Sequence, residues 1–365
     1  MSPRLFFGNF SFEHHLAQPG WNPPARLRRL DAELAPIWWA VAEEGDFVWA
    51  PEVFPESFWE MPPEWGLPQL CPISDWLHLP TNVEIVPWGW TSELAGEARK
   101  RHPEGHRPDV AVVRHVNSRA YRVELERELS PYFTGSQVLT STEEFATLLK
   151  PVSPNAKWVL KANWGMSGRE QWRGQGQEIS EACANWLRAR LARQGVVVWE
   201  PWLESLAEVG IQCEIPVAGP VEFMGLTESV VDAFGQFAGC WVQGVPEAAW
   251  HGQAIEQALR AAAFVQKAGY FGPLGIDAML FRNLEGELCL RPLQDLNARW
   301  TMGRIALGWR RLLQPAERAF WSHLPNSPPV FLSLTRRLSL APPFLGSSPL
   351  QRRTELLIDA PSFNQ

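Results

Sequence analysis

The chain alternates between short apolar runs that end in polar turns and longer segments in which apolar residues recur at helical spacing. The first pattern is typical of strands and the second of helices. Strands are therefore expected at residues 5–7, 110–113, 158–161, 196–199 and 275–280, and helices at residues 120–129, 178–194 and 254–268.

Two neighbouring strand-like segments in the C-terminal third carry acidic and amide side chains. Asp277 lies in the first, and the second ends with Asp295, Asn297 and Arg299. Side chains alternate along a strand, so these last three residues point to one face. Carboxylate and amide oxygens suit Mg²⁺ that bridges phosphates, and arginine adds a fixed fork for phosphate or carboxylate. An ordinary polar surface hairpin is the alternative, and this segment alone does not exclude it.

A lysine and two glycines follow an apolar strand further upstream. Lys161 ends the strand, and Gly165 and Gly168 lie in the loop after it. Glycines let backbone N–H groups close over phosphates, and the lysine supplies a point charge. The loop is not a Walker A sequence, because no Gly-Lys-Ser/Thr follows the glycines. Two glycines at this spacing more often form a simple turn, which is the alternative here.

The next apolar strand runs out into an acidic and aromatic segment, residues 199–204. The backbone of such a segment can hydrogen-bond the edge of an adenine, and a carboxylate can hold a ribose. A buried strand that leaves the core is the alternative, and it is favoured for this segment alone.

Together and in this order, the three segments resemble the ATP-grasp superfamily of carboxylate–amine and carboxylate–thiol ligases. The resemblance extends over residues 110–310, and residues 291–304 are most similar to bacterial stand-alone peptide ligases. It implies an α/β fold in which an N-terminal pre-ATP-grasp domain precedes two ATP-grasp lobes. The implied parts are residues 1–115 for the N-terminal domain, 116–200 for lobe A, 201–314 for lobe B and 315–365 for a C-terminal extension of open role.

The resemblance also implies which residues hold ATP between the lobes. Lys161 would contact the nucleotide phosphates, under the loop that contains Gly165, Ser167 and Gly168. Arg119, just before the helix expected at residues 120–129, would be a further basic contact.

The nucleoside contacts implied by the resemblance follow the next strand. Glu200 would lie beside adenine, with backbone contacts from Trp202 and Leu203. Glu208 fits the ribose-binding position best, and Glu204 is its competitor.

The metal ligands implied by the resemblance are Asp277, Asp295 and Asn297, with Arg299 acting on the transferred phosphoryl group. The sequence departs from the family here in two ways. Asp295 stands where a glutamate is usual, so its reach to two metals is shorter. The hairpin between Asp277 and Asp295 is also longer, so its register needs a bulge or an extra turn.

Composition and charge restrict the class of protein further. The net charge of −7 with no basic stripe argues against nucleic-acid binding. Five scattered cysteines without a Cys-x-x-Cys pair favour a reducing, cytoplasmic setting. The start of the chain turns polar too soon for a signal peptide, and no apolar run is long enough to cross a membrane. Most of the 20 tryptophans are expected in the core and at domain interfaces, and several before residue 100 in a pocket.

The resemblance implies an ADP-forming ligase that needs ATP and Mg²⁺. A substrate carboxylate would become an acyl phosphate, which an amine from an amino acid or peptide-like molecule would attack. One alternative is a non-catalytic ATP-binding partner protein, and another is a kinase-like phosphotransferase on the same fold. Expected partners are small-molecule or peptide carboxylates and amines, and a homodimer is compatible with the superfamily.

Overall fold

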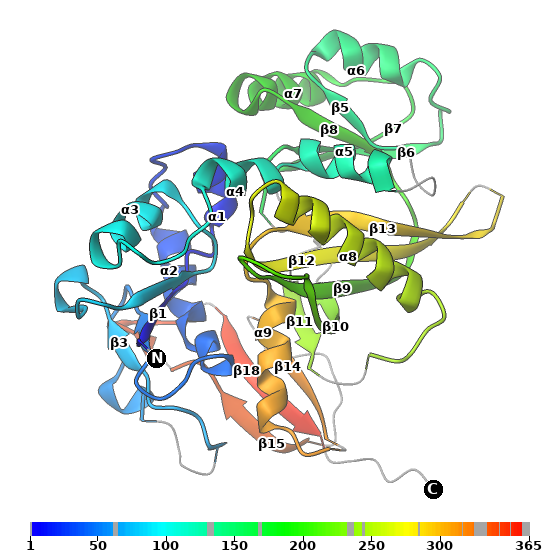
Figure 1. Ribbon diagram of the computed structural model, residues 1–365. Coiled ribbons are helices and arrows are strands. Elements are labelled where there is room, and N and C mark those ends of the chain that lie inside the picture. The colour runs from blue at the N-terminus through cyan, green and yellow to red at the C-terminus, as the bar shows by residue number, and fades with distance from the viewer. Residues whose placement is uncertain are drawn as a thin grey trace, which may run out of the picture.

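The computed structural model describes residues 2–60, 65–129, 135–166, 170–231, 237–242, 245–283, 285–315, 317–324, 334–342, 344–350 and 352–359. The expected α/β class is confirmed (Figure 1). An N-terminal domain lies beside a large sheet, and a smaller lobe lies above that sheet in this view. Among the described residues, no helix has the length and apolar character needed to cross a membrane.

Four parallel strands form the sheet of the N-terminal domain, in the order β3-β2-β1-β4. They are β1 (Arg4–Phe7), β2 (Phe47–Trp49), β3 (Cys71–Ile73) and β4 (Glu84–Pro87). The helical segments of this domain are α1 (Phe12–Ala17), α2 (Ala25–Leu34), α3 (Ser92–Arg101) and the 3₁₀ helices η1 (Ala35–Ala40), η2 (Glu56–Phe58) and η4 (Trp76–His78).

Buried aromatic rings fill the space beside the carboxyl ends of β1 and β4. The Phe6 and Trp38 ring centroids are 5.0 Å apart, and those of Phe10 and Trp88 are 4.8 Å apart. Ligands of parallel α/β sheets bind at this edge, where the loops that follow the strands converge. The packing therefore fixes the loops after β1 and β4 at the edge that faces the rest of the molecule.

The strand expected at residues 110–113 is wrong, because this segment is the helix α4 (Val110–Val116). Three of its first four residues are β-branched valines, which favour strands locally. The side chain of Asp109 caps the helix by accepting from the Ala111 N–H, and Val113 and Val116 are buried one turn apart. Capping and tertiary packing thus outweigh the local preference.

The three expected helices are confirmed as α5 (Arg119–Leu129), α7 (Glu181–Gln194) and α8 (His251–Lys267). Helix α7 begins three residues later than expected, because the Ser180 side chain caps it by accepting from the Cys183 N–H.

The smaller lobe is an antiparallel sheet in the order β5-β8-β6-β7. The elements are β5 (Gln137–Leu139), α6 (Thr142–Leu149), β6 (Lys157–Ala162), β7 (Gln171–Gln175), α7 and β8 (Val197–Pro201). Helices α6 and α7 cover it, and Phe145, Trp158 and Leu187 are buried in their shared core. Val159 pairs with Glu200 and Lys161 pairs with Val198, so the side chains of Lys161 and Glu200 are diagonal neighbours on one face of this sheet. Glu200 reaches Arg291 on a strand of the large sheet, so this face is turned toward that sheet.

Eight strands form the large sheet, in the order β13-β12-β9-β10-β11-β14-β18-β15. They are β9 (Ser205–Ile215), β10 (Glu222–Val231), β11 (Phe237–Trp241), β12 (Gly272–Arg282), β13 (Leu288–Asn297), β14 (Arg318–Leu324), β15 (Leu334–Ser339) and β18 (Arg353–Asp359). The strands after residue 315 therefore continue the sheet of the preceding segment. The remaining elements are α9 (Met302–Gly308), η5 (Trp309–Leu312), β16 (Phe344–Leu345) and β17 (Ser348–Pro349).

The long hairpin of β12 and β13 contains the register change that its length requires. Asp277 pairs with Asp295, and Met279 pairs with Arg291, so β13 holds two extra residues between these pairs. Pro292, which has no N–H to donate to the ladder, lies within this stretch. The expected bulge is confirmed, and it returns Asp295 to the position directly opposite Asp277.

The N-terminal domain packs against the end of this hairpin. The Trp300 N–H donates to the carbonyl oxygen of Trp88, and the rings of Trp38 and Trp300 meet edge to face at 5.4 Å. The expectation that tryptophans pack the core and this interface is confirmed. The contact brings the loops at the edge of the parallel sheet next to the polar end of β13.

Candidate nucleotide and metal site

Two carboxylates face each other on adjacent strands at one end of the large sheet. Asp277 on β12 and Asp295 on β13 are direct cross-strand partners. Like charges placed opposite each other in an antiparallel pair repel. Burial, together with the neighbouring charges of Asp295 and Glu208, raises the pKa of Asp277 to about 7. This pair therefore favours a bound cation.

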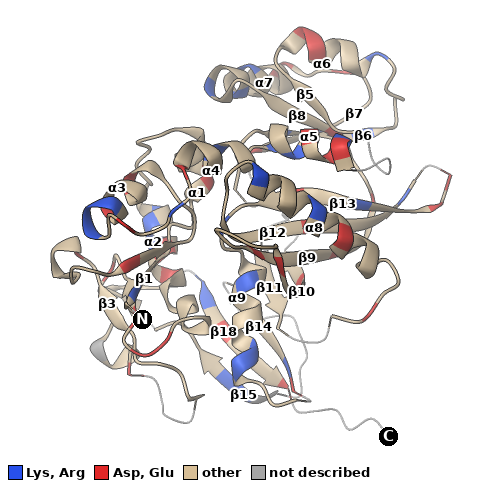
Figure 2. Ribbon diagram, viewed as in Figure 1, with Lys and Arg blue, Asp and Glu red and all other residues tan. Residues whose placement is uncertain are grey.

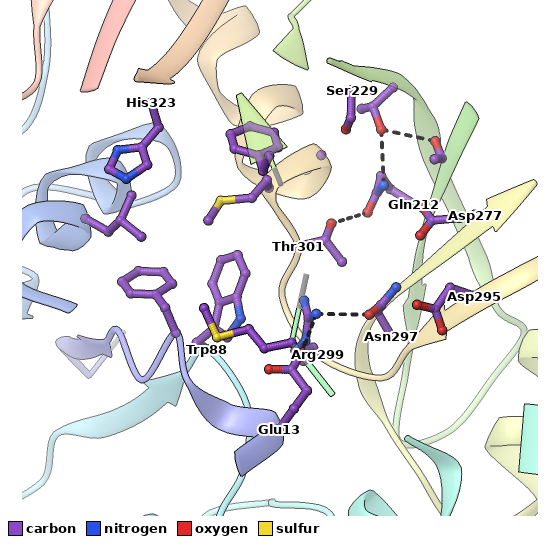
Figure 3. A pocket seen from close by; sticks show the side chains of 18 of the residues that line it. Glu13, Trp88, Gln212, Ser229, Asp277, Asp295, Asn297, Arg299, Thr301 and His323 are labelled. Carbon is purple, nitrogen blue, oxygen red and sulfur yellow. Dashed lines mark hydrogen bonds and ion pairs between the residues drawn. The ribbon is translucent and has the colours of Figure 1, made fainter. Parts of the chain in front are cut away.

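The amide of Asn297 completes this group of oxygen donors. Its Oδ1 atom accepts a hydrogen bond of 2.9 Å from Arg299 Nη2 (Figure 3). Among the described residues no group of three or more His, Cys, Asp and Glu side chains could hold a metal. Two carboxylates and one amide suit Mg²⁺, which keeps positions for water and phosphate oxygens instead of taking a full set of protein ligands. The donors present therefore fit this metal.

A small residue leaves room beside the carboxylates. Gly210 on β9 pairs with Asp277, and a Cβ atom there would lie 2.8 Å from Thr227 Oγ1 and 3.0 Å from Gln212 Nε2. These two side chains bond each other at 3.2 Å, and the Thr301 hydroxyl donates to Gln212 at 2.6 Å. A larger residue at position 210 would push this polar layer apart, so glycine preserves the space next to Asp277.

Arg299 is held by Glu13, a residue of the N-terminal domain that the sequence analysis did not identify. Arg299 Nη2 lies 2.6 Å from Glu13 Oε1, and both side chains are nearly buried. The second carboxylate oxygen, Glu13 Oε2, is buried and has no hydrogen-bond partner among the described residues. The pair is separated by 286 positions in sequence, so no local pattern could have revealed it.

The expected phosphate contact Lys161 belongs to a cluster of buried ion pairs between the two lobes. Lys161 Nζ lies 2.8 Å from Glu200 Oε2, which also accepts from Arg291 at 3.1 Å. The Lys161 side chain is 21% exposed, whereas the other members are almost fully buried. We call this group the basic cluster; its members are Arg122, Glu126, Lys161, Glu200 and Arg291.

The basic cluster has three cations for two carboxylates. Burial alone would raise the pKa of Glu200, but Arg122, Arg291 and Lys161 hold that pKa well below its usual value. Burial lowers the pKa of Lys161, Glu200 opposes this effect, and the nearby arginines add to it. The cluster therefore has one surplus positive charge at its most exposed member, where an anionic phosphate would be stabilised.

Arg119 connects the start of the glycine loop to the carboxylate pair. Its guanidinium donates to the carbonyl oxygens of Ala162 at 2.7 Å and Gly165 at 3.2 Å, and lies 3.8 Å from Asp295 Oδ2. The expected loop residues Ser167 and Gly168 lie outside the described residues. Arg119 and Gly165 thus stand between the basic cluster and Asp295.

The expected nucleoside contacts lie where β8 leads into β9. The Trp202 N–H donates to the Lys157 carbonyl oxygen, so this amide is not available to an adenine, and Leu203 is the remaining position. The Trp202 ring is 43% exposed, with Arg173 stacked over it at 4.4 Å. Glu208 is exposed on β9, two residues from Gly210, and so shares the face of Asp277.

A cavity of about 250 Å³ opens beside the carboxylate pair (Figure 3). Of the expected site residues that the structure describes, the cavity brings together Gly165, Asp277, Asp295, Asn297 and Arg299. Those that do not line it are Arg119, Lys161, Glu200, Trp202, Leu203 and Glu208. The sequence analysis did not identify several other lining residues, among them Glu13, Trp88, Gln212, Thr301, His323 and Arg352.

Comparison with known proteins gives a curated relative and several solved structures of similar fold. A butirosin acyl-carrier protein–L-glutamate ligase from Niallia circulans is 27% identical over 225 residues, which are 60% of this chain and 51% of the relative. The chain thus spans about half the length of this curated relative. No protein-family model matches the chain.

Several solved structures share the architecture at low sequence identity. N5-carboxyaminoimidazole synthetase from Staphylococcus aureus, solved with ADP, has a TM-score of 0.56 at 10% identity, with 99% of this chain and 94% of that chain covered. The biotin carboxylase domain of Hydrogenobacter thermophilus 2-oxoglutarate carboxylase, solved with MgADP, has a TM-score of 0.57 at 12% identity, with 99% and 87% covered.

A third structure carries the name of the superfamily. A putative ATP-grasp superfamily protein from Archaeoglobus fulgidus has a TM-score of 0.51 at 14% identity, with 98% of this chain and 99% of that chain covered. The fold implied by the order of the sequence motifs is therefore confirmed, and the chain has the ATP-grasp fold.

Proposed function

We propose that this protein is an ATP- and Mg²⁺-dependent ligase that activates a carboxylate as an acyl phosphate for attack by an amine. The observation that carries the proposal is the pairing of Asp277 with Asp295 across from a basic cluster with surplus positive charge. The ligase activity named for the curated relative and the ADP complexes of the structural neighbours support it.

The basic cluster and the residues around it would hold the nucleotide. Lys161 would contact the phosphates, because it is the exposed end of the surplus charge. Arg119 would support it from the start of the loop that contains Gly165, Ser167 and Gly168. Glu200, fixed by three cations, would orient Lys161, while Leu203 and Trp202 would border the adenine and Glu208 the ribose.

At the other side of the phosphates, Asp277, Asp295 and Asn297 would hold Mg²⁺. When bound, the metal would neutralise phosphate oxygens in a phosphoryl transfer that is mostly a matter of placement. Arg299 would orient the substrate carboxylate and offset charge on the transferred phosphoryl group. Glu13 already pairs with Arg299 and offsets its positive charge. The orientation of the Glu13 side chain therefore controls how much of that charge acts on the substrate.

The reaction would proceed in two steps, a phosphoryl transfer followed by an acyl transfer. A carboxylate oxygen would attack the γ-phosphorus, the bond from that phosphorus to ADP would break, and the acyl phosphate would form. The amine nitrogen would then attack the carbonyl carbon, its proton would pass to the departing phosphate, and inorganic phosphate would leave as the amide forms. Glu13 Oε2, buried and without a partner among the described residues, would accept a hydrogen bond from the incoming amine.

Hydroxylamine tests this proposal directly. In the presence of Mg·ATP and a panel of carboxylates, wild-type protein should form a hydroxamate together with ADP, and Asp295→Asn should form neither. A stable phosphoester without hydroxamate would instead favour the phosphotransferase alternative. Binding of ATP with no ADP release for any carboxylate would favour a non-catalytic partner protein, although the bulge that restores the pairing of Asp277 with Asp295 argues against a lapsed metal site.

A further inference from the structure

The cavity continues away from the carboxylate pair to a second polar end, which we call the distal end. It is formed by His323 on β14 and Arg352, which directly precedes β18. Figure 3 shows the Trp88 side chain between His323 and Asp295. Both distal residues belong to the C-terminal segment, for which the sequence analysis found no role.

The imidazole of His323 has an unsatisfied nitrogen in this cavity. The residue is 4% exposed, and its Nδ1 atom lies 2.9 Å from the Thr354 hydroxyl. Its Nε2 atom is buried and has no hydrogen-bond partner among the described residues. Leaving a buried polar atom unpaired is costly, so such an atom in a cavity indicates a missing ligand.

His323 is suited to donate a hydrogen bond as a neutral group. Burial, together with the charge of Arg352, lowers the pKa of His323 to about 3, so the ring is uncharged at neutral pH. The Thr354 hydroxyl can donate its proton to Nδ1, which leaves the imidazole proton on Nε2. In that tautomer Nε2 offers a donor to the cavity.

Arg352 adds a positive charge to the same end. One of its terminal nitrogens donates to the carbonyl oxygen of His323 at 3.3 Å. Among the described residues, no carboxylate forms an ion pair with Arg352. A half-buried guanidinium next to an unsatisfied N–H forms a fork that matches a carboxylate.

The wall between the two polar ends is apolar. It consists of side chains from the N-terminal domain and the large sheet, namely Phe10, Leu30, Leu34, Trp88, Phe237 and Met302. An apolar segment of a ligand would be stabilised there, whereas a charge would lose its hydration without compensation. The cavity thus has an anion-binding group at each end, Arg299 at one and Arg352 at the other, with an apolar section between them.

We infer that the carboxylate substrate is a diacid-like molecule, with an apolar body between the carboxylate that reacts beside Asp295 and a second anionic group held by Arg352 and His323. The assignment of the reacting carboxylate to the end beside Asp295 rests on the proposed function. The distal anion site does not depend on the proposed function, because it is inferred from the distal residues alone.

Calorimetric titration with simple probes tests the inference without turnover. Suberate and octanoate have the same chain length and differ in the second carboxylate, and adipate and hexanoate form a shorter pair. Each is titrated into wild-type protein with and without Mg·ADP. The diacid of a pair should bind more tightly than its monoacid by at least about tenfold, as a charge-assisted hydrogen bond predicts.

Two arginine variants provide the matched comparison. Arg352→Gln should weaken diacid binding by roughly ten- to a hundredfold and leave monoacid binding unchanged. Arg353→Gln alters an exposed neighbour and should change neither. Equal binding of diacid and monoacid to wild type, no diacid binding at all, or equal effects of the two variants would overturn the inference.

The outcomes separate the inference from the proposed function. A diacid preference that depends on Arg352, in protein that forms no hydroxamate, would support the distal site and refute the ligase. Hydroxamate formation with octanoate and suberate at equal efficiency would support the ligase and refute the distal site. Should Arg352→Gln fail to fold, the wild-type comparison of the matched acids decides alone.

Discussion

The two charged regions of the site differ in how fully the protein satisfies them. Every carboxylate of the basic cluster is paired with arginine or lysine, and Ser136 adds hydrogen bonds to it. Asp277 and Asp295 instead face each other, and the nearest arginine to Asp295 in the described part of the chain, Arg119, is 3.8 Å away. The protein itself therefore satisfies the charges of one region, whereas under the proposed function a cation would complete the other.

This difference indicates separate roles for the basic cluster and the carboxylate pair. Removing one partner from a buried ion pair leaves an uncompensated charge, so the basic cluster has to be retained for the lobes to stay together. The carboxylate pair lowers the stability of the ligand-free protein, and a bound metal would recover that cost. Under the proposed function, surplus positive charge on one side and surplus negative charge on the other would together favour Mg²⁺ with a polyphosphate.

The largest effect is expected when the basic cluster is broken. Arg291→Met leaves both Glu126 and Glu200 short of a partner, so the free energy of unfolding should fall by about 3–5 kcal/mol. Denaturant unfolding measures this change. Arg282→Met on the same hairpin is the control, since Arg282 is exposed and bonds only a turn carbonyl among the described residues. Equal stabilities of the two variants would show that the cluster is not structural.

A smaller loss is expected at the junction of the N-terminal domain and the hairpin. Glu13→Gln keeps the shape of the side chain but removes the charge that pairs with Arg299, so unfolding should become easier by about 2 kcal/mol. Glu256→Gln, on the exposed side of α8, is a suitable control. If the two variants unfold alike, the Arg299 pairing contributes nothing to the interface.

The smallest effect is expected at the carboxylate pair and depends on pH. The native pKa of Asp277 is raised, so its protonated form is the stabilising one, and that stability is lost as pH rises through about 7. In metal-free protein the loss between about pH 6 and pH 8 should be about 1 kcal/mol. Thermal unfolding of wild type and Asp277→Asn checks this.

The variant should lack this part of the pH dependence, and saturating Mg·ATP should abolish it in wild type, because a bound cation favours the ionised carboxylates. A wild-type profile that runs parallel to that of Asp277→Asn without metal would contradict the assignment of this pair as the incomplete region.

Local pattern was sufficient to predict the elements that carry the carboxylate pair. Asp277 and Asp295 meet because their strands form a hairpin. The bulge was expected from the family resemblance, because this hairpin is longer than is usual in that family. The strand expected at residues 110–113 was wrong because a cap and two buried valines decided that segment.

The rest of the cavity could not be predicted in this way. Glu13 reaches Arg299 across the domain interface, and His323 and Arg352 come from strands that extend the sheet after residue 315. These contacts depend on how domains pack, which is not encoded in the spacing of neighbouring residues. The ion pairs of Glu200 could not be predicted from local pattern either, because its three cationic partners come from α5, β6 and β13.

The central claim is that the basic cluster and the carboxylate pair hold one Mg·ATP between them. Thermal unfolding with and without Mg·ATP tests it in wild type, Lys161→Ala and Asp295→Ala. Nucleotide at about a hundred times its Kd should stabilise wild type by roughly 2.7 kcal/mol in a Mg²⁺-dependent manner, and both variants should lose the effect. No stabilisation of folded wild type at millimolar Mg·ATP, or a loss confined to Lys161→Ala, would contradict the account.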